Sequence, residues 1–477
     1  MSDQTDTILT ADYADTQEAT DKARIAPEPE ADTAGRGLLA APDDEASAAL
    51  PDWWREGRAQ AWRQFEALEM PARTEQAWRF ASLGKVVLDA YQPPQPVSGE
   101  TRERLIGRAR GNAKTAGRMV FANDTLLDRR VQVQTAFNQG VIWKPLEAAF
   151  AENADLLREH FMAQDAKLGS AKFAALHRAH VRNGTFLFVP KNVEVELPLE
   201  VFHWLSGEGG SAFPHTLIIA EAGSRVTLVD YFESDNAQEG GFACAVNDLI
   251  VGAGAKVNYV CAQNWGEKVV SFQINATTVA RDASAASLHL NLGAAYARLE
   301  SLSSLAGAGG RSDMLAATVA DGSQEFDQRT LQDHLEPHTV SDLLYKNALA
   351  DAAKTIFAGL IRVDAKAQHT DAYQKVRNLM LSEEAEANSM PGLEILADEV
   401  RCTHGATSGN IDAEELFYLL ARGIDHKTAQ ELIVQGFLAE ALERLQERNV
   451  TPRLGELLAE KFARMKKRRM TGGTVAA

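Results

Sequence analysis

The chain has 477 residues, of which 45% are hydrophobic and 24% are charged, a composition typical of a folded protein. It carries 49 basic against 66 acidic side chains, a net charge of −17, so we do not expect nucleic-acid binding. Residues 1–52 hold 13 acids and 3 bases, which puts −10 of this charge in the N-terminal stretch and −7 in the rest.

The N-terminal stretch predicts neither a folded segment nor an export signal. Residues 1–50 are rich in Ala, Asp, Glu, Thr and Pro, so they cannot bury enough apolar surface to offset chain entropy, and we expect a disordered acidic tail. They lack the basic and apolar parts of a signal peptide, and no apolar run approaches the ~18–20 residues of a membrane helix. The three cysteines are too few for a disulfide framework. We therefore expect a cytoplasmic protein that does not contact the membrane.

An N-terminal helical region is expected over residues 51–180. Large apolar residues recur at helical spacing up to Pro71, and helical patterns return at 101–117 and 144–180. The residues of the first pattern are Trp53, Trp54, Trp62, Phe65 and Leu68.

Between residues 184 and 370 the hydrophobic period drops to two, which predicts short strands such as Thr185–Val189 and Arg225–Val229. An imperfect repeat is also present, because the segment 221–229 aligns with the segment 252–260, 31 residues later. Such a unit cannot close its own core, so stacked copies predict a β-helix over residues 181–410. A β-sandwich with coincidentally similar turns is the alternative.

The helical period returns after residue 411, which predicts a C-terminal helical region over residues 411–477. Asp412 followed by Glu415 is typical of a capping box, and Gly423 is typical of a helix C-terminus. Asp425 and Thr451-Pro452 predict the starts of two further helices. The predicted fold is therefore mostly β, with a parallel β-helix between two helical regions.

Nucleotide-binding and histidine motifs are weak in this sequence. Gly252-Ala-Gly254 lacks a third glycine and Gly84-Lys85 lacks an upstream one, so we expect this chain to bind no nucleotide. The pairs His177/His180 and His334/His338 have no obvious third ligand, and we expect them to be structural or exposed. Cys244 and Cys261 lie in apolar strand patterns typical of inert core thiols.

Cys402 and His404 form the one pattern that could carry chemistry. They alternate along a predicted strand, so the thiol and the imidazole should project from one face, roughly 6–7 Å apart at Cβ. Sulfur beside nitrogen suits iron, zinc or a transferred sulfur atom, although simple packing also explains such a pair. A complete four-cysteine cluster site is impossible with three cysteines.

The C-terminal half of the sequence contains several distinctive blocks. They are Ala367-Gln-His-Thr-Asp-Ala-Tyr-Gln374, Arg377-Asn-Leu379, Pro391-Gly-Leu-Glu-Ile-Leu-Ala-Asp398, Cys402-Thr-His-Gly-Ala-Thr407 and Leu416-Phe-Tyr-Leu-Leu-Ala-Arg-Gly423. A short N-terminal block is Arg73-Thr-Glu-Gln-Ala-Trp-Arg79. With these blocks, the sequence resembles the SufB/SufD family of SUF iron–sulfur cluster assembly proteins over about residues 180–445.

Within the family the sequence is most similar to the SufD branch. The SufB branch has a Glu-His-Glu-Ala-Thr type sequence where this chain has 403–407, and it has a cysteine where this chain has 379–381. The missing cysteine implies that the sulfur-accepting thiolate belongs to the partner. By position, the resemblance implies that His404, and secondarily Cys402, bind iron or a transient iron–sulfur cluster at the partner interface.

The resemblance also implies the fold and the assembly. It implies helices at both ends of a right-handed β-helix, a heterodimer with a SufB-like paralogue through the β-helices, and a SufC-like ATPase docked on residues 411–477. The chain would then be a non-catalytic scaffold subunit, where iron enters during cluster assembly driven by that ATPase. The alternatives are a SufB-like scaffold acting alone, a homodimer in place of the heterodimer, and a β-helix interaction scaffold with no ligand role. A polysaccharide lyase is a further β-helix alternative, but the sequence lacks the catalytic clusters and signal peptide that it would need.

Overall fold

A computed structural model describes residues 37–42 and 50–472 of the chain. All described residues belong to one compact unit. Most of the predicted acidic tail, residues 1–36 and 43–49, lies outside the described residues. Within the tail, residues 37–42 contribute a buried Leu38, whose backbone N–H donates to the Tyr91 carbonyl over 3.0 Å.

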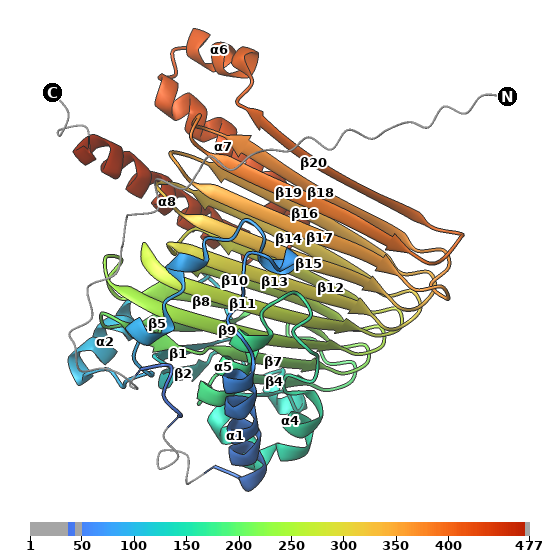
Figure 1. Ribbon diagram of the computed structural model, residues 1–477. Coiled ribbons are helices and arrows are strands. Elements are labelled where there is room, and N and C mark those ends of the chain that lie inside the picture. Colours follow the sequence, from blue (N-terminus) through green and yellow to red (C-terminus); the bar gives the residue numbers. More distant parts are fainter. Residues whose placement is uncertain (1–36, 43–49, 473–477) are drawn as a thin grey trace. The chain divides into compact units, whose positions relative to one another are not determined.

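This unit is built on two facing sheets between which the chain alternates (Figure 1). Sheet A has the order β2-β1-β5-β8-β10-β12-β14-β16-β18-β20, and sheet B has the order β19-β17-β15-β13-β11-β9-β7-β4-β3, with β6 paired to β9. From β4 to β20 neighbouring strands within each sheet are parallel, as in a β-helix. The predicted mostly β fold with a parallel solenoid is therefore confirmed.

The 31-residue sequence repeat coincides with the hydrogen-bonded register. Arg225 pairs with Lys256 and Val229 with Val260, the same positions that align in the sequence. Gly223 and Gly254 occupy equivalent turns with φ of +71° and +65°, a conformation that glycine adopts without strain. Each coil therefore stacks on the next in the way that the repeat predicts.

The strands lengthen along the solenoid and then stay near ten residues. Side chains alternate between the lumen, which is the interior between the sheets, and the outer faces. The strands are β1 (Gly117–Ala122), β2 (Thr125–Val131), β3 (Ile142–Pro145), β4 (Thr185–Val189), β5 (Leu199–Leu205), β6 (Gly210–Ala212), β7 (His215–Ala220), β8 (Arg225–Ser234), β9 (Gly240–Val251), β10 (Lys256–Asn264), β11 (Lys268–Val279), β12 (Ser284–Asn291), β13 (Tyr296–Leu305), β14 (Arg311–Ala320), β15 (Glu325–His334), β16 (Val340–Leu349), β17 (Lys354–Val363), β18 (Asp371–Met380), β19 (Glu386–Ile395) and β20 (Arg401–Asn410).

The N-terminal region is mixed, whereas the sequence pattern predicted helices. Strands β1 and β2 form an antiparallel hairpin around Asn123 and Asp124, whose φ angles are +44° and +63°. Because β1 is only six residues long, its period-two signal is too short to stand out from the helical pattern before it. The helices are α1 (Asp52–Ala67), α2 (Gly99–Arg108), α3 (Leu146–Glu152), α4 (Ala154–His160) and α5 (Ala171–His180).

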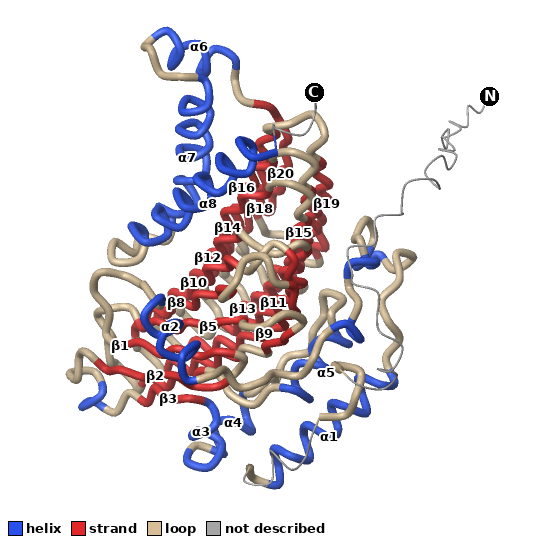
Figure 2. Tube along the Cα trace, turned by 90° about the vertical axis from the view of Figure 1, so that its left-hand side faces the viewer, coloured by secondary structure: helices blue, strands red, loops and turns tan. Residues whose placement is uncertain are grey.

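The helices cover opposite faces of the solenoid (Figure 2). Phe173 and Leu176 of α5 share an apolar cluster with Phe242 and Phe272 on the outer face of sheet B. The C-terminal helices α7 (His426–Arg444) and α8 (Thr451–Gly472) cover sheet A instead, and Lys461 of α8 is buried against it. None of the described helices is long and apolar enough to cross a membrane.

The two ends of the solenoid differ. At the N-terminal end β2 and β3 run antiparallel to their neighbours; β2 carries Asp128, Arg129 and Arg130, and β3 has only four residues. Charges and short length protect a sheet edge from pairing with another strand. At the C-terminal end β19 and β20 are each ten residues long, and each pairs with one neighbour. The open edge of the solenoid is therefore the C-terminal one.

Candidate functional site

Cys402 and His404 lie on β20, the last strand of sheet A, as the sequence pattern predicted. Cys402 pairs with Ala372 and His404 with Gln374 on β18, and both of these neighbours are buried in the lumen. Paired residues on adjacent strands share a face of the sheet, so Cys402 and His404 both point to the lumen. No described strand pairs with β20 on its outer side, so His404 is exposed although it faces inward.

Cys402 is half-buried at this open end. It packs against an apolar cluster that includes Ile361, Ala372 and Ala397. Burial, and secondarily the charge of Asp371, raise the pKa of its thiol. The free thiol is therefore held protonated and must lose its proton to become a metal ligand.

The backbone of β20 is unpaired on its outer side. The Arg401 N–H donates to the Thr370 carbonyl over 2.8 Å, so the N–H groups of Cys402, His404 and Ala406 point away from β18. On β19 the Glu386 N–H likewise donates inward, to the Ala353 carbonyl over 3.0 Å, which leaves Pro391 on the outward set. Proline is tolerated at this position because it has no backbone N–H, and no hydrogen bond to the neighbouring strand is lost there.

Below the open end the lumen is polar. Asn378 donates to Ser408 over 3.1 Å and accepts from Asn347 over 2.8 Å, and Gln328 donates to the Asn347 amide oxygen over 3.0 Å. Gln374 lies on the same face of β18, four residues before Asn378, with 1% exposure and no hydrogen-bond partner for either amide atom. The hydrogen-bonded row of Gln328, Asn347, Asn378 and Ser408 therefore runs from the interior coils to β20, the strand that carries His404.

The other cysteines lie in the core, which confirms the prediction for them. Cys244 and Cys261 are fully buried, and burial raises the pKa of both thiols.

The predicted histidine pairs are structural or exposed, as expected. His177 Nδ1 donates to the Cys244 carbonyl over 2.7 Å, and His180 is buried. His334 contacts Thr339 and Ser341 over 2.8 Å each, and burial lowers its pKa to about 4. His338 is exposed.

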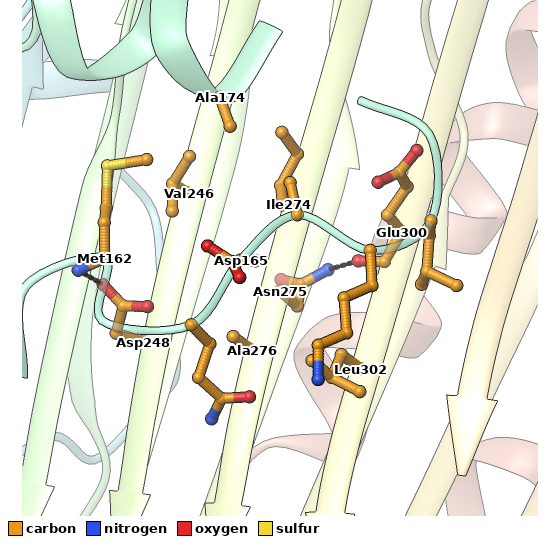
Figure 3. A pocket seen from close by; sticks show the side chains of 14 residues that line it. Met162, Asp165, Ala174, Val246, Asp248, Ile274, Asn275, Ala276, Glu300 and Leu302 are labelled. Atoms are coloured by element: carbon orange, nitrogen blue, oxygen red, sulfur yellow. Dashed lines mark hydrogen bonds between the residues drawn. The ribbon is translucent and has the colours of Figure 1, made fainter. Parts of the chain in front are cut away.

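A small cavity elsewhere in the molecule is far too small for a cluster. It has a volume of about 20 Å³, room for about one water molecule, and lies between residues 162–174 and the outer face of sheet B (Figure 3). In Figure 3 the Met162 N–H donates to Asp248, and Asn275 donates to the Glu300 carbonyl. No residue of β18, β19 or β20 lines it.

The part of the chain that the structure describes contains no group of three or more His, Cys, Asp or Glu residues arranged to hold a metal ion. Cys402 and His404 therefore form an incomplete donor set, although a thiol and an imidazole are chemically suited to iron.

A second exposed feature follows β20 directly. Helix α6 (Ala413–Ala421) begins at Asp412, whose side chain accepts the Glu414 and Glu415 N–H groups, as the capping pattern predicted. None of its residues is buried, and Phe417 and Tyr418 are 70% and 56% exposed. In Figure 2 α6 projects from the end of the molecule that carries β20. Exposed aromatic residues on a helix of this kind are typical of a docking surface.

Two known protein families match this chain, one in its N-terminal region and one in its solenoid. Residues 43–201 match the family described as the SufBD protein N-terminal region. Residues 203–437 match the family described as the SUF system FeS cluster assembly SufBD core domain. The chain belongs to the SufB/SufD family. The resemblance seen in the sequence blocks is thereby confirmed.

Three SufB/SufD relatives indicate how the similarity is distributed. The iron–sulfur cluster assembly protein SufD of Bacillus subtilis is 30% identical over 420 residues, 86% of this chain and 94% of the relative. The SufB protein of the same organism is 30% identical over 300 residues, 63% of this chain and 64% of the relative. A SufBD family protein of Staphylococcus epidermidis matches with the same identity and coverage as SufB. The chain thus spans less than two thirds of the length of the latter two relatives.

Cys402 and His404 were predicted from the sequence, whereas Gln374 was not recognised as a neighbour of the site. A signal for it was present, because Gln374 precedes His404 by 30 residues, about one coil of the repeat. The unpaired edge of β20 carries no local signal, since a strand sequence does not tell whether another coil follows it.

Proposed function

We propose that this chain is a SufD-like scaffold subunit of a SUF assembly in which iron–sulfur clusters are built. The observation that carries the proposal is the open edge of β20, whose lumen face presents Cys402 and His404. An incomplete pair of ligands at an unpaired strand edge is suited to a site that a second chain completes.

The partner in this proposal is a SufB-like paralogue. Its terminal strands add to β19 and β20 by backbone hydrogen bonding, with the two solenoids joined end to end. That contact brings the partner's sulfur-accepting thiolate beside His404, which serves as the point where iron enters. Cys402 is the second iron or cluster ligand. The iron and the nascent cluster are cargo rather than a resident cofactor.

The energy source in this proposal is a SufC-like ATPase, and this chain catalyses no reaction itself. The ATPase docks on α6, where Phe417 and Tyr418 are exposed. Helix α7 links α6 to sheet A, because Lys346 of β16 pairs with Glu440 and donates to the Phe437 carbonyl over 2.6 Å. A movement of α6 imposed by ATP is thereby transmitted toward the strands that end in the site.

The assembly state is tested by native mass spectrometry of the tagged chain, purified without oxygen together with its natural partners. A complex with a SufB-like chain and ATPase subunits is expected. A homodimer without a paralogue, or a lone chain, would overturn the heteromeric assignment.

The ligand role is tested by His404→Ala in that complex. Iron and sulfide content should fall several-fold while the complex stays assembled. Thr403→Ala is the matched control, because Thr403 lies on the same strand but on the opposite face. If the His404→Ala and parent complexes contain equal amounts of iron and sulfide, the ligand role is wrong. The chain would then be an interaction scaffold that supplies no iron or cluster ligand.

A further inference from the structure

Gln374 is the side chain next to His404 on the lumen face. The two residues pair in the parallel register of β18 and β20. Adjacent strands lie roughly 4.8 Å apart, so a glutamine side chain reaches the ring of its neighbour. The lumen residues on either side of Gln374 along β18 are Ala372, beside Cys402, and Val376, beside Ala406, and their side chains cannot form hydrogen bonds.

The Gln374 carboxamide is buried without a partner. Its exposure is 1%, and neither Nε2 nor Oε1 has a hydrogen bond among the described residues. Buried amides are nearly always hydrogen-bonded, so an exception needs an explanation. A hydrogen bond that forms when the exposed His404 ring turns toward the amide is one such explanation.

Gly359 gives this carboxamide its space. A methyl group at Gly359 would collide with Gln374 Nε2 and would lie 2.6 Å from Thr330 Oγ1. Gly359 has no positive φ that would call for glycine, so close approach is the reason that a side chain is excluded there. The absence of a side chain at Gly359 therefore lets the Gln374 carboxamide fit inside the lumen.

A histidine that binds a metal through one ring nitrogen generally uses the other in a hydrogen bond, which fixes the tautomer and the orientation of the ring. An amide suits this task because it offers both an acceptor oxygen and donor hydrogens without adding charge. We propose that Gln374 is a positioning residue that holds the His404 imidazole in one tautomer and orientation for iron. This inference rests on the proposed iron-binding role of His404.

The first test needs no iron and uses the full chain. Gln374→Leu keeps a similar volume but removes the amide, and the melting temperature should stay unchanged or rise because the amide has no partner in the lumen. Nitrogen NMR of ¹⁵N-histidine-labelled protein at one fixed pH should show a single His404 tautomer in the parent and a mixture in the variant. The same tautomer population in both proteins would overturn the inference.

The second test measures ferrous ion binding without oxygen, in the complex with the SufB-like partner. Gln374→Leu should weaken binding about 10–100-fold, and it should add nothing in a His404→Ala background. Thr330→Val is the matched control. Like Gln374→Leu, it removes a buried, unpartnered polar group beside Gly359, but Thr330 is not a neighbour of His404.

The outcomes separate the two proposals. Unchanged binding in His404→Ala would defeat the proposed function itself. Weaker binding in His404→Ala but not in Gln374→Leu would defeat only the role of Gln374. An equal loss in Thr330→Val would also overturn that role, since general polarity of the lumen would then explain the effect.

Discussion

The guanidinium of Arg298 lies over the ring of Trp78, 3.6 Å from the ring centroid, and both side chains are buried. Arg298 also pairs with Glu300 over 2.7 Å and with Asp327 over 2.5 Å. Trp78 belongs to the short N-terminal block that resembles the family, and Arg298 lies on β13 of the solenoid. This contact therefore holds the N-terminal region against sheet B.

Replacing Trp78 by Ala should lower the free energy of unfolding by about 3–5 kcal/mol, because it opens a large cavity and uncovers a buried charge. Urea denaturation followed by circular dichroism measures the change. Arg79→Ala is the control, since its exposed side chain should contribute no more than about 0.5 kcal/mol. Equal effects of the two substitutions would contradict the contact.

His289 should make the fold sensitive to acid. It is buried in the lumen with both ring nitrogens unpartnered, and burial lowers its pKa from 6.5 to about 3. Between these values the unfolded chain binds a proton that the folded chain does not. The stabilisation is therefore complete above about pH 6.5 and is lost as the pH falls toward 3, by up to ~1.4 kcal/mol per pH unit.

His289→Leu should make the free energy of unfolding depend less steeply on pH, because up to one proton fewer is taken up on unfolding. At pH 8 its free energy of unfolding should equal or exceed that of the parent. Urea denaturation at pH 5, 6, 7 and 8 measures the slope. Met314→Leu, which lines the same small lumen cavity, is the control without a titrating group. If the free energy of unfolding falls with pH as steeply in His289→Leu as in the control, groups other than His289 govern the acid response.

Ala406→Pro tests the open edge. Its N–H points away from β18, so proline there removes a donor only from the free side of β20. We expect a nearly unchanged melting temperature and at least about tenfold weaker binding to the SufB-like partner by isothermal calorimetry. Gly405→Pro is the contrast, because the Gly405 N–H points to β18 and its loss should lower the melting temperature. Full partner affinity in Ala406→Pro would exclude pairing along β20.

Phe417→Ala and Tyr418→Ala test the docking helix. Because both rings are more than half exposed, each substitution should change the unfolding free energy by no more than about 0.5 kcal/mol. Affinity for the SufC-like ATPase, measured by surface plasmon resonance, should fall about tenfold or more if these aromatics anchor the contact. Lys427→Ala, in the exposed first turn of α7, is the control. Unchanged affinity in both aromatic variants would place the ATPase elsewhere.

The sequence predicts the repetitive part of the fold better than its ends. The 31-residue offset between Arg225 and Lys256 is both a sequence period and a hydrogen-bonded register, so the solenoid follows from the chain itself. The caps at Asp412 and Asp425 are equally local, and both form as predicted. The β1–β2 hairpin was missed because its strands are short and because β1 also pairs with β5, which lies far along the chain.

The candidate site was predictable only in part. The alternation of Cys402 and His404 is a property of one strand, so it could be read from the sequence. Which face points into the lumen, and that Gln374 lies beside His404, depend on how coils stack. Those relationships emerge only when segments 30 residues apart are placed side by side.

The unlike ends of the solenoid limit how many chains can join. A stack of coils with a free edge at each end would add further copies without limit and grow into a filament, as cross-β fibres do. Here the charged β2 and the short β3 block growth at one end, and among the described strands only β19 and β20 offer unpaired edges of ten residues. In the proposed assembly a single partner would pair with both of those edges at once. Such a contact would close after two solenoids instead of continuing into a filament.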